Sequence, residues 1–292
     1  MKKYFKRIAI FSSKRDKRVN QITLQLVEIL KNLNLDVLIP DSSSFSKKLH
    51  LKRYKDEYIL KNADLLVSVG GDGTLLSSAR KFGSNGLPLL GINLGNLGFL
   101  TDIAPDELTN SINEVILGRF KEDERILLKA SIVGSSEENI ALNEVVIHSG
   151  TVAQLIEYEL FLNGEFVFRQ KADGLILSTS TGSTAYSLSG NGPIVHPEVK
   201  AITLLPMFPH SLNATPLIVD ENTIIKMKIV GKRKAKLSLD SHNFMSLNLD
   251  DEVQISKTSQ SVKLIHPETH NFFSACRTKL GWSLGLSNTK ET

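Results

Sequence analysis

The chain has 292 residues, of which 41% are hydrophobic and 23% are charged, and its formal net charge is +4. This composition is typical of a soluble globular protein with one large or two ordinary domains. The charge is modest and no aromatic residues are interleaved with the basic ones, so we expect no nucleic-acid partner. We also expect no membrane partner and a cytoplasmic location, because no apolar run approaches the length of a membrane span and Cys276 is the only cysteine.

Short apolar runs alternate with helical patterns over residues 1–122, which predicts an α/β domain with a parallel sheet. Strands are expected at 8–11, 35–39, 65–69 and 87–93. Pro105 is expected to open a helix. The serine-rich and basic stretch 42–58 is expected to be exposed or mobile.

A glycine-rich turn with one carboxylate follows the third of these strands. Its residues are Gly70, Gly71, Asp72, Gly73 and Thr74. Glycines let backbone N–H groups approach a ligand, and Thr74 is expected to cap a helix whose N-terminus suits phosphate. A carboxylate repels phosphate, so Asp72 makes chemical sense as a base for an attacking hydroxyl or as a ligand of a phosphate-bridging metal. A second glycine-rich turn, at 91–98, is expected at the same edge of the sheet, where ligands bind in such folds.

The sequence pattern changes after Phe120: short Val-, Ile- and Leu-rich runs follow one another with turn residues between them. This predicts a mainly β domain over residues 123–269, with Asn163-Gly164 as a type I′ hairpin turn. The expected strands include 140–148, 253–256 and 262–265. The apolar tail 270–292 is expected to pack back on the first domain.

Two further stretches carry polar groups in an apolar setting. Asn143 and Glu144 lie inside the predicted strand 140–148, so one of them should face a core or a site and needs a partner or ligand. The run from Asp173 to Ser189 is dense in hydroxyls, which suit ribose and phosphate oxygens, and Tyr186 offers a flat face for a base. A plain Ser/Thr turn is the alternative reading.

Together these stretches resemble the bacterial NAD kinase family over nearly the whole chain. The glycine turn alone is shared with phosphofructokinases and with diacylglycerol and sphingosine kinases. The resemblance becomes specific when the segment Gly91 to Thr101, the pair Asn143-Glu144 and the run from Asp173 to Ser189 are added.

The resemblance implies ATP-dependent phosphorylation of the 2′-hydroxyl on the adenosine ribose of NAD, with a divalent metal, magnesium being expected. It implies that Asp72 is the general base and that Gly73 lies beside the substrate. It further implies a homo-oligomer, usually a tetramer, with sites completed across subunits. The NAD-binding residues that it implies are Asn143, Glu144, Asp173, Thr184, Ala185, Tyr186, Ser187, Leu188 and Ser189.

Some positions depart from the family pattern. Gln154 stands where a basic or histidine residue is frequent, and His242 stands where a glutamine is frequent; both are kept as expected binding residues. Lys171 keeps the usual positive charge two residues before Asp173. Ser180 replaces a proline, which loosens the turn without removing a donor.

Two other functions fit the glycine turn. A lipid kinase of the same superfold would need a deep apolar pocket and would not need Asn143-Glu144. A non-catalytic nucleotide-binding protein would gain nothing from Asp72 beside phosphate.

Overall fold

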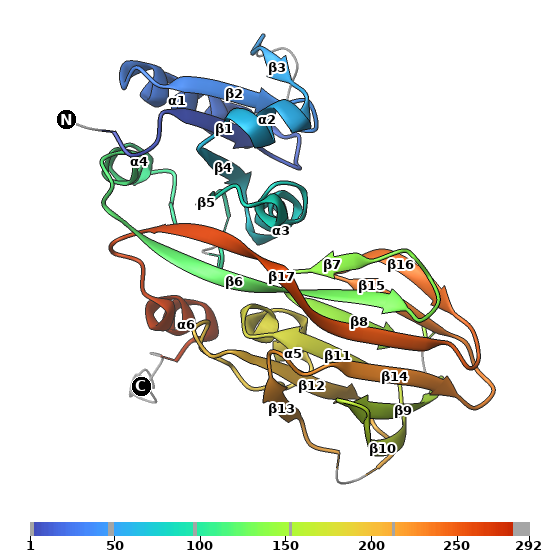
Figure 1. Cartoon of the computed structure of the whole chain (residues 1–292). Coiled ribbons are helices and arrows are strands. Elements are labelled where there is room, and N and C mark those ends of the chain that lie inside the picture. The colour runs from blue at the N-terminus through green and yellow to red at the C-terminus, as the bar shows by residue number, and fades with distance from the viewer. Residues whose placement is uncertain (1–2, 46–49, 96–97, 152–153, 212–213, 283–292) are drawn as a thin grey trace, which may run out of the picture. The chain divides into compact units, whose positions relative to one another are not determined.

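The computed structural model describes residues 3–45, 50–95, 98–151, 154–211 and 214–282 (Figure 1). The chain divides into two compact units, and each has its own hydrophobic core. The first, the α/β unit, comprises Met1–Glu124 and Val262–Thr292. The second, the β unit, comprises Arg125–Ser261. No helix in the described part of the chain is long and apolar enough to cross a membrane.

The α/β unit is built on a parallel sheet in the order β5-β4-β1-β2-β3, and the last residues of β17 pair in parallel with β5. Its helices follow the sequence pattern: the buried residues of α1 recur at helical spacing, and the Asp16 side chain caps that helix by accepting a hydrogen bond from Val19 N at 2.8 Å. The elements are β1 Arg7–Phe11, α1 Lys17–Asn32, β2 Asp36–Pro40, β3 Arg53–Tyr54, α2 Asp56–Asn62, β4 Leu65–Gly70, α3 Asp72–Lys81, β5 Leu89–Asn93, α4 Leu108–Ile116 and α6 Phe272–Leu280.

The two glycine-rich turns lie side by side at the carboxyl edge of this sheet. Gly70, the last residue of β4, pairs with Asn93, the last residue of β5. Leu94 N then donates a hydrogen bond to Gly70 O at 2.8 Å. The edge at which a parallel sheet binds its ligands is therefore the edge that carries both turns.

The β unit contains two antiparallel sheets that share one hydrophobic core. One sheet has the order β13-β12-β11-β8-β15-β16, and the other contains β10-β9-β14-β17 with β6 and β7. Its elements are β6 Phe120–Ile132, β7 Asn139–Ala141, β8 Glu144–His148, β9 Ile156–Leu162, β10 Glu165–Ala172, β11 Gly174–Thr179, α5 Tyr186–Ser189, β12 Ala201–Met207, β13 Leu217–Asp220, β14 Ile225–Val230, β15 Ala235–Leu239, β16 His242–Leu247 and β17 Glu252–Pro267. Strands β6 and β17 have residues in both units.

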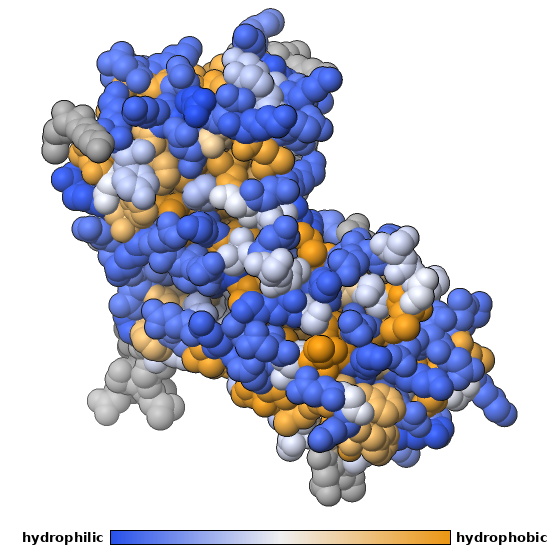
Figure 2. Space-filling view, in the orientation of Figure 1, coloured by the Kyte–Doolittle hydropathy of each residue, from blue (hydrophilic) through white to orange (hydrophobic). Residues whose placement is uncertain are grey.

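Asn163 and Gly164 both have positive φ, 51° and 86°, so the expected type I′ turn joins β9 to β10. Apolar side chains on β10 and β13, among them Phe166, Val167 and Ile218, are exposed. Figure 2 shows apolar, orange surface on the part of the β unit where Figure 1 places these strands. The expected combination of an α/β domain with a parallel sheet and a mainly β domain is confirmed.

Three expectations for individual segments are wrong in whole or in part. The stretch 42–58 is not simply exposed: Phe45 is buried, and the Arg53 guanidinium donates to the carbonyls of Ser43 and Phe45 at 2.8 and 2.9 Å; residues 46–49 lie outside the described part. Residues 253–265 form one strand, β17, because the polar residues between the two apolar runs include no glycine or proline to break it. The expected strand 140–148 is interrupted at Leu142 and Asn143.

Candidate active site

The glycine turn joins the fully buried strand β4 to helix α3. The helix begins at Asp72 with Gly71 as its N-cap, and no side chain caps it. Thr74 is therefore not the cap that we expected. It lies in the first helical turn, where its N–H reaches Gly71 O at 2.8 Å and its hydroxyl accepts a hydrogen bond from Ser13 at 3.1 Å. With no side-chain cap, backbone N–H groups at this end of the helix remain available to an anion.

The Asp72 carboxylate is held by the second glycine-rich segment. Phe99 N donates to Oδ2 at 2.9 Å, while Leu100 N and the Thr101 hydroxyl donate to Oδ1 at 3.2 and 2.9 Å. Both oxygens thus accept hydrogen bonds from groups that the fold fixes in place. The arrangement fixes the Asp72 carboxylate at the N-terminus of α3, where a base is expected from the sequence.

The glycines of the two turns have different surroundings. A Cβ at Gly98 would lie 1.9 Å from Asp72 Oδ1, and one at Gly70 would lie 2.2 Å from Thr74 Oγ1, so the protein itself fills these spaces. A Cβ at Gly71 or Gly73 would meet no atom within 4 Å. Gly70 and Gly98 are therefore needed for packing, whereas Gly71 and Gly73 leave open surface beside Asp72.

Lys279, on α6, is a neighbour of Asp72 that the sequence pattern did not reveal. Its Nζ lies 3.9 Å from Asp72 Oδ2 and 4.6 Å from the centroid of the Phe99 ring. The sequence indicated only that the apolar tail should pack on the α/β domain. The spacing of apolar residues carries no information on which polar side chain of α6 would reach the glycine turn.

Asp102, the residue after Thr101, is held by two histidines. Its carboxylate accepts hydrogen bonds from Nδ1 of His266 and, at 3.0 Å, pairs with Nδ1 of His270; the two rings stack with centroids 4.1 Å apart and 19° between planes. Burial opposes ionisation of Asp102, but the hydrogen bonds from the two histidines outweigh it and hold the pKa of the carboxyl well below its usual range.

These three side chains are also of the types that bind divalent transition metals. In this geometry, however, the nearly parallel stack directs the in-plane Nδ1 atoms side by side instead of toward a common point. Two hydrogen bonds to one carboxylate suit such a stack, whereas a shared ion needs both ring planes to meet at it. We therefore interpret Asp102, His266 and His270, which we call the Asp102 clasp, as a structural cluster. It fixes the end of the segment Phe99 to Thr101, which donates hydrogen bonds to Asp72.

In the β unit, Asp240 organises the Asn143-Glu144 pair. Asp240 is buried in the tight turn between β15 and β16, where its φ is +47°. Its carboxylate accepts hydrogen bonds from the backbone N–H groups of Leu142, Asn143 and Glu144 at 3.0, 2.8 and 3.2 Å. These N–H groups donate to the Asp240 side chain instead of to a neighbouring strand. The expected strand is therefore interrupted here.

Both side chains of the pair are buried. Asn143 Oδ1 and Glu144 Oε2 have no hydrogen-bond partner among the described residues. Burial and the nearby charge of Asp240 raise the pKa of Glu144 to about 8, although a hydrogen bond from the Tyr186 backbone opposes the shift. Buried polar atoms without partners are costly, so this pair is suited to a ligand that supplies hydrogen bonds.

The hydroxyl-rich run packs against the same pair. Thr179 N donates to Asn143 O at 2.9 Å, and a Cβ at Gly182 would lie 2.1 Å from that carbonyl. The buried Ser183 hydroxyl donates a hydrogen bond to Val195 O and accepts one from Val195 N. This hydroxyl is therefore used within the fold and is not available to a ligand. Tyr186, by contrast, is 43% exposed. The segment from Thr184 to Ser189, which includes Ala185, Ser187 and Leu188, forms the end of a short 3-10 turn and helix α5.

The structure brings His242 to this end of the β unit, but not Asp173 or Lys171. His242 is exposed, and its Nδ1 is 2.7 Å from Asp240 O. Asp173 immediately precedes β11, and the segment Thr184 to Ser189 follows that strand, so the six residues of β11 separate them. At about 3.3 Å per residue this is roughly 20 Å, too far for one set of side chains to meet around a small group. Gln154 is exposed just before β9.

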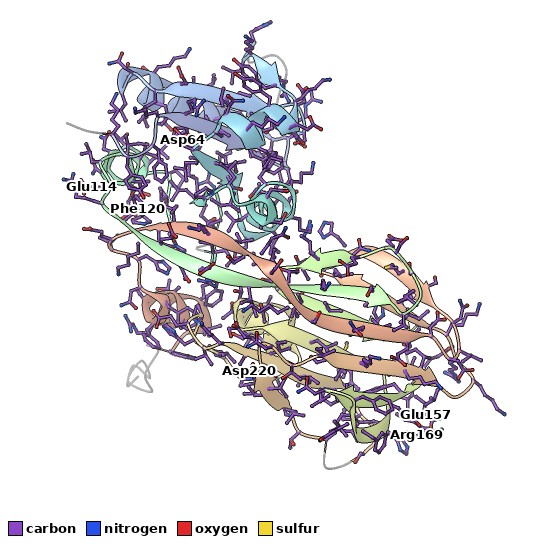
Figure 3. All side chains as sticks on the ribbon, in the orientation of Figure 1. Asp64, Glu114, Phe120, Glu157, Arg169 and Asp220 are labelled. Atoms are coloured by element: carbon purple, nitrogen blue, oxygen red, sulfur yellow. The ribbon has the colours of Figure 1, made fainter. Side chains whose placement is uncertain are left out.

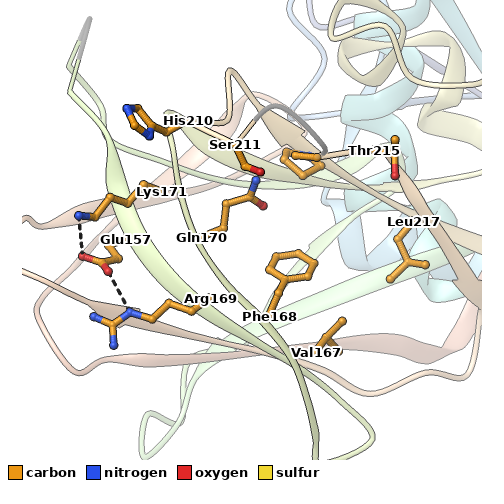
Figure 4. Close-up of a pocket in the computed structure, with 12 residues that line it drawn as sticks. Glu157, Val167, Phe168, Arg169, Gln170, Lys171, His210, Ser211, Thr215 and Leu217 are labelled. Atoms are coloured by element: carbon orange, nitrogen blue, oxygen red, sulfur yellow. Dashed lines mark hydrogen bonds and ion pairs between the residues drawn. The ribbon is translucent and has the colours of Figure 1, made fainter.

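Lys171 lines a pocket of about 700 Å³ formed by residues of β9 and β10, by Pro206, and by residues within 210–211 and 214–217 (Figure 4). Its Nζ lies 3.7 Å from Glu157 Oε2, and the other oxygen of Glu157 accepts a hydrogen bond from Arg169 at 2.9 Å (Figure 4). Figure 3 labels Glu157 and Arg169 on the β unit. His210 and Gln170 also line this pocket. The β unit thus presents two separate polar regions, one at each end of β11.

Comparison with known proteins agrees with these features. Residues 8–120 match the ATP-NAD kinase N-terminal domain, and residues 142–267 match the ATP-NAD kinase C-terminal domain. An NAD kinase from Teredinibacter turnerae is 40% identical over 270 residues, covering 90% of this chain and 92% of the relative. An NAD kinase from Chromohalobacter salexigens is 46% identical over 228 residues, which cover 76% of this chain and 78% of the relative.

Two solved structures are similar along most of the chain. A yeast NADH kinase complexed with NADH has a TM-score of 0.88 and 28% identity, covering 98% of this chain and 90% of that one. An Archaeoglobus fulgidus NAD kinase in complex with ATP has a TM-score of 0.73 and 27% identity. The match covers 93% of this chain and 99% of that one.

The chain belongs to the ATP-NAD kinase family. These findings support the function of an NAD kinase, a phosphotransferase that uses ATP, and they favour it over the lipid kinase of the same superfold.

Proposed function

We propose that Asp72 is the general base in the transfer of the terminal phosphoryl group of ATP to the 2′-hydroxyl of the adenosine ribose of NAD. The hydroxyl oxygen forms a bond to the terminal phosphorus, the bond from that phosphorus to the bridging oxygen of ADP breaks, and the hydroxyl proton passes to Asp72. A neutral ribose hydroxyl is a weak nucleophile, so a fixed carboxylate beside it lowers the barrier. The observation that supports this proposal is the set of three hydrogen bonds that Phe99, Leu100 and Thr101 donate to Asp72 at the N-terminus of α3.

Asp72 is not assigned as a ligand of the divalent metal expected from the family. Its carboxylate already accepts three hydrogen bonds from the segment Phe99 to Thr101, and in the proposed reaction its remaining acceptor position, on Oδ2, receives the hydroxyl proton. Magnesium prefers substrate phosphates and water to dedicated protein cages, so it would enter with the phosphates of ATP. The open surface at Gly71 and Gly73 and the N-terminus of α3 are suited to those phosphates.

We infer that Asn143 and Glu144 bind the ribose hydroxyls of NAD. The buried atoms Asn143 Oδ1 and Glu144 Oε2 have no partners among the described residues, and a ribose diol offers two donors. Tyr186 is exposed beside them and can stack on the adenine or nicotinamide ring. His242 and the segment Thr184 to Ser189 would surround the same part of NAD.

Asp173 and Lys171 are assigned to the nicotinamide part of NAD bound to another subunit. Their distance from Glu144 along β11 supports this, because a single β unit does not bring both groups to one ring. The exposed apolar side chains Phe166 and Val167 beside this region favour a second copy as the covering surface. A homo-oligomer, a tetramer in particular, and a cytoplasmic location stay predictions.

The test is NADP formation from NAD, ATP and magnesium by the wild type and by Asp72→Asn, which keeps the shape and removes the base. We expect a loss of at least roughly 10²-fold in kcat, the lower range for removing a general base, with NAD still bound. Asp106→Asn, an exposed change in the same unit, serves as the control and should retain activity. Near-full activity of Asp72→Asn would show that Asp72 is not the base.

A further inference from the structure

Lys279 is a cation beside the proposed base that has no part in the mechanism so far. Its Nζ lies 3.9 Å from Asp72 Oδ2, beyond hydrogen-bond distance, and its side chain is 24% exposed. Among the described residues, its contacts with charged or aromatic groups are Asp72 and the Phe99 ring, whose centroid is 4.6 Å away. The ammonium is therefore held in place electrostatically while its three N–H donors are not committed to Asp72.

The contacts of Lys279 join it to the segment that grips the base. Phe99 donates its backbone N–H to Asp72 Oδ2 and presents its ring to Lys279. One residue thus fixes both the carboxylate and the cation. Phe272, at the start of the same helix, also contacts the Phe99 ring, with centroids 6.5 Å apart. Helix α6 accordingly has a second anchor on this segment, which limits how far Lys279 can move.

A cation at this place has a specific use in phosphoryl transfer. Negative charge is spread over the equatorial oxygens of the transferring group, and fixed cations that face those oxygens lower the barrier. The attacking hydroxyl lies between its base and the phosphorus atom. A group 3.9 Å from the base is therefore near the terminal phosphate as well.

We propose that Lys279 binds the terminal phosphate of the nucleoside triphosphate donor and stabilises its charge during transfer. This inference rests on the proposed role of Asp72 and adds to it a residue that distinguishes a triphosphate from a diphosphate. The ammonium donates to an oxygen of the terminal phosphate while Asp72 accepts the proton of the attacking hydroxyl. No bond to Lys279 forms or breaks, and its proton count does not change.

The inference is tested with Lys279→Gln, Lys279→Arg and the control Arg277→Gln. Arg277 lies on the same helix, is exposed and loses the same charge. For each protein, NADP formation and the dissociation constants of ADP and of the β,γ-imido analogue of ATP are measured with magnesium present. Thermal unfolding confirms that each variant is folded.

We expect the wild type and Arg277→Gln to bind the triphosphate analogue more tightly than ADP. In Lys279→Gln this preference should fall by roughly 10- to 100-fold, the value of one charge-assisted hydrogen bond, together with kcat. Lys279→Arg should recover part of both. A residue that only supports the fold would weaken both nucleotides equally.

The outcomes separate the two proposals. If the wild type makes NADP and Lys279→Gln keeps the preference for the triphosphate, the role of Lys279 is overturned and that of Asp72 stands. If Lys279→Gln loses the preference while Asp72→Asn keeps full activity, the phosphate contact stands without the proposed base. If the wild type makes no NADP, the proposed reaction itself is wrong.

Discussion

The hydroxyl of Thr101 donates a hydrogen bond to Asp72 Oδ1 across 2.9 Å. Asp72 lies in the first glycine-rich turn, and Thr101 ends the segment Gly91 to Thr101, which contains the second. The pairing of β4 with β5 brings the two turns to one edge of the sheet. Because the Thr101 hydroxyl and the adjacent backbone N–H groups orient the carboxylate, the second turn has a function even if it never touches a nucleotide.

Thr101→Val should therefore reduce kcat by about 10- to 100-fold, since it removes one hydrogen bond to the carboxylate while keeping the side-chain volume. Thr101→Ser keeps the hydroxyl and should stay within a few-fold of the wild type. Steady-state kinetics of NADP formation check both. Equal rates for the valine and serine variants would show that this hydrogen bond does not position Asp72.

Two glycine substitutions should have different effects, because only one of them crowds the Asp72 carboxylate. Gly98→Ala places a Cβ 1.9 Å from Asp72 Oδ1, so the carboxylate must move, and displacement of about 1 Å can cost roughly 10²-fold in rate. Gly73→Ala meets no protein atom within 4 Å and lies in a helix, so its melting temperature should equal or exceed that of the wild type. Its KM for ATP should rise if the phosphates occupy that open surface. Thermal unfolding and kinetics on both variants make the comparison.

The pH dependence of stability should report on Glu144. The pKa of this buried carboxyl is raised from 4.5 to about 8, so the folded state holds a proton that the unfolded state releases. The stability that this group contributes is full below pH 4.5 and is lost as pH rises toward 8. Relative to Glu144→Gln, the wild type should become less stable over this range, by on the order of a few kcal/mol. Urea unfolding at several pH values measures the difference, and the exposed Glu165→Gln is the control.

Asp240→Asn should destabilise the β unit by about 2–3 kcal/mol, because an amide cannot accept from three N–H groups as a carboxylate does. Affinity for NAD should fall with it, since Asn143 and Glu144 lose their fixed backbone. Asp250→Asn is a matched change at an exposed turn and should have little effect. Urea unfolding measures the stability of each variant, and titration with NAD measures its affinity. Equal stability and equal affinity for the two aspartate variants would contradict this prediction.

Acid should loosen the Asp102 clasp. Its folded pKa lies below the ordinary value of 3.8, so its contribution to stability is present above about pH 4 and is lost as pH falls below it. His270→Phe keeps a ring for stacking on His266 and removes one hydrogen bond to Asp102. This variant should unfold at a higher pH than the wild type during acid titration followed by circular dichroism. An unchanged acid midpoint would show that the clasp adds no stability.

The local pattern of the sequence was enough for much of the fold. The buried run Leu65–Gly70 and the glycines after it predicted a strand followed by a helix, and Asn163-Gly164 predicted a hairpin whose two positive φ values the structure has. Such features depend on neighbours in the chain: burial sets the period of apolar residues, and the absence of a Cβ sets which φ values are available. Errors arose where a side chain bonded the backbone of another segment. Asp240, far along the chain, interrupts the expected strand 140–148, and within the stretch 42–58 the Arg53 side chain binds the carbonyl of Ser43 in a region whose composition indicated exposure.

The sequence by itself thus determined the two fold classes, the position of Asp72 after a buried strand and the family resemblance. Only the tertiary structure decided what surrounds Asp72 and Glu144. Thr101 and Lys279 reach Asp72, and Asp240 reaches Glu144, because separate parts of the chain return to the same place. Hydrogen bonds and charge interactions depend on distance in space, and residue spacing along the chain does not encode that distance for segments far apart in sequence.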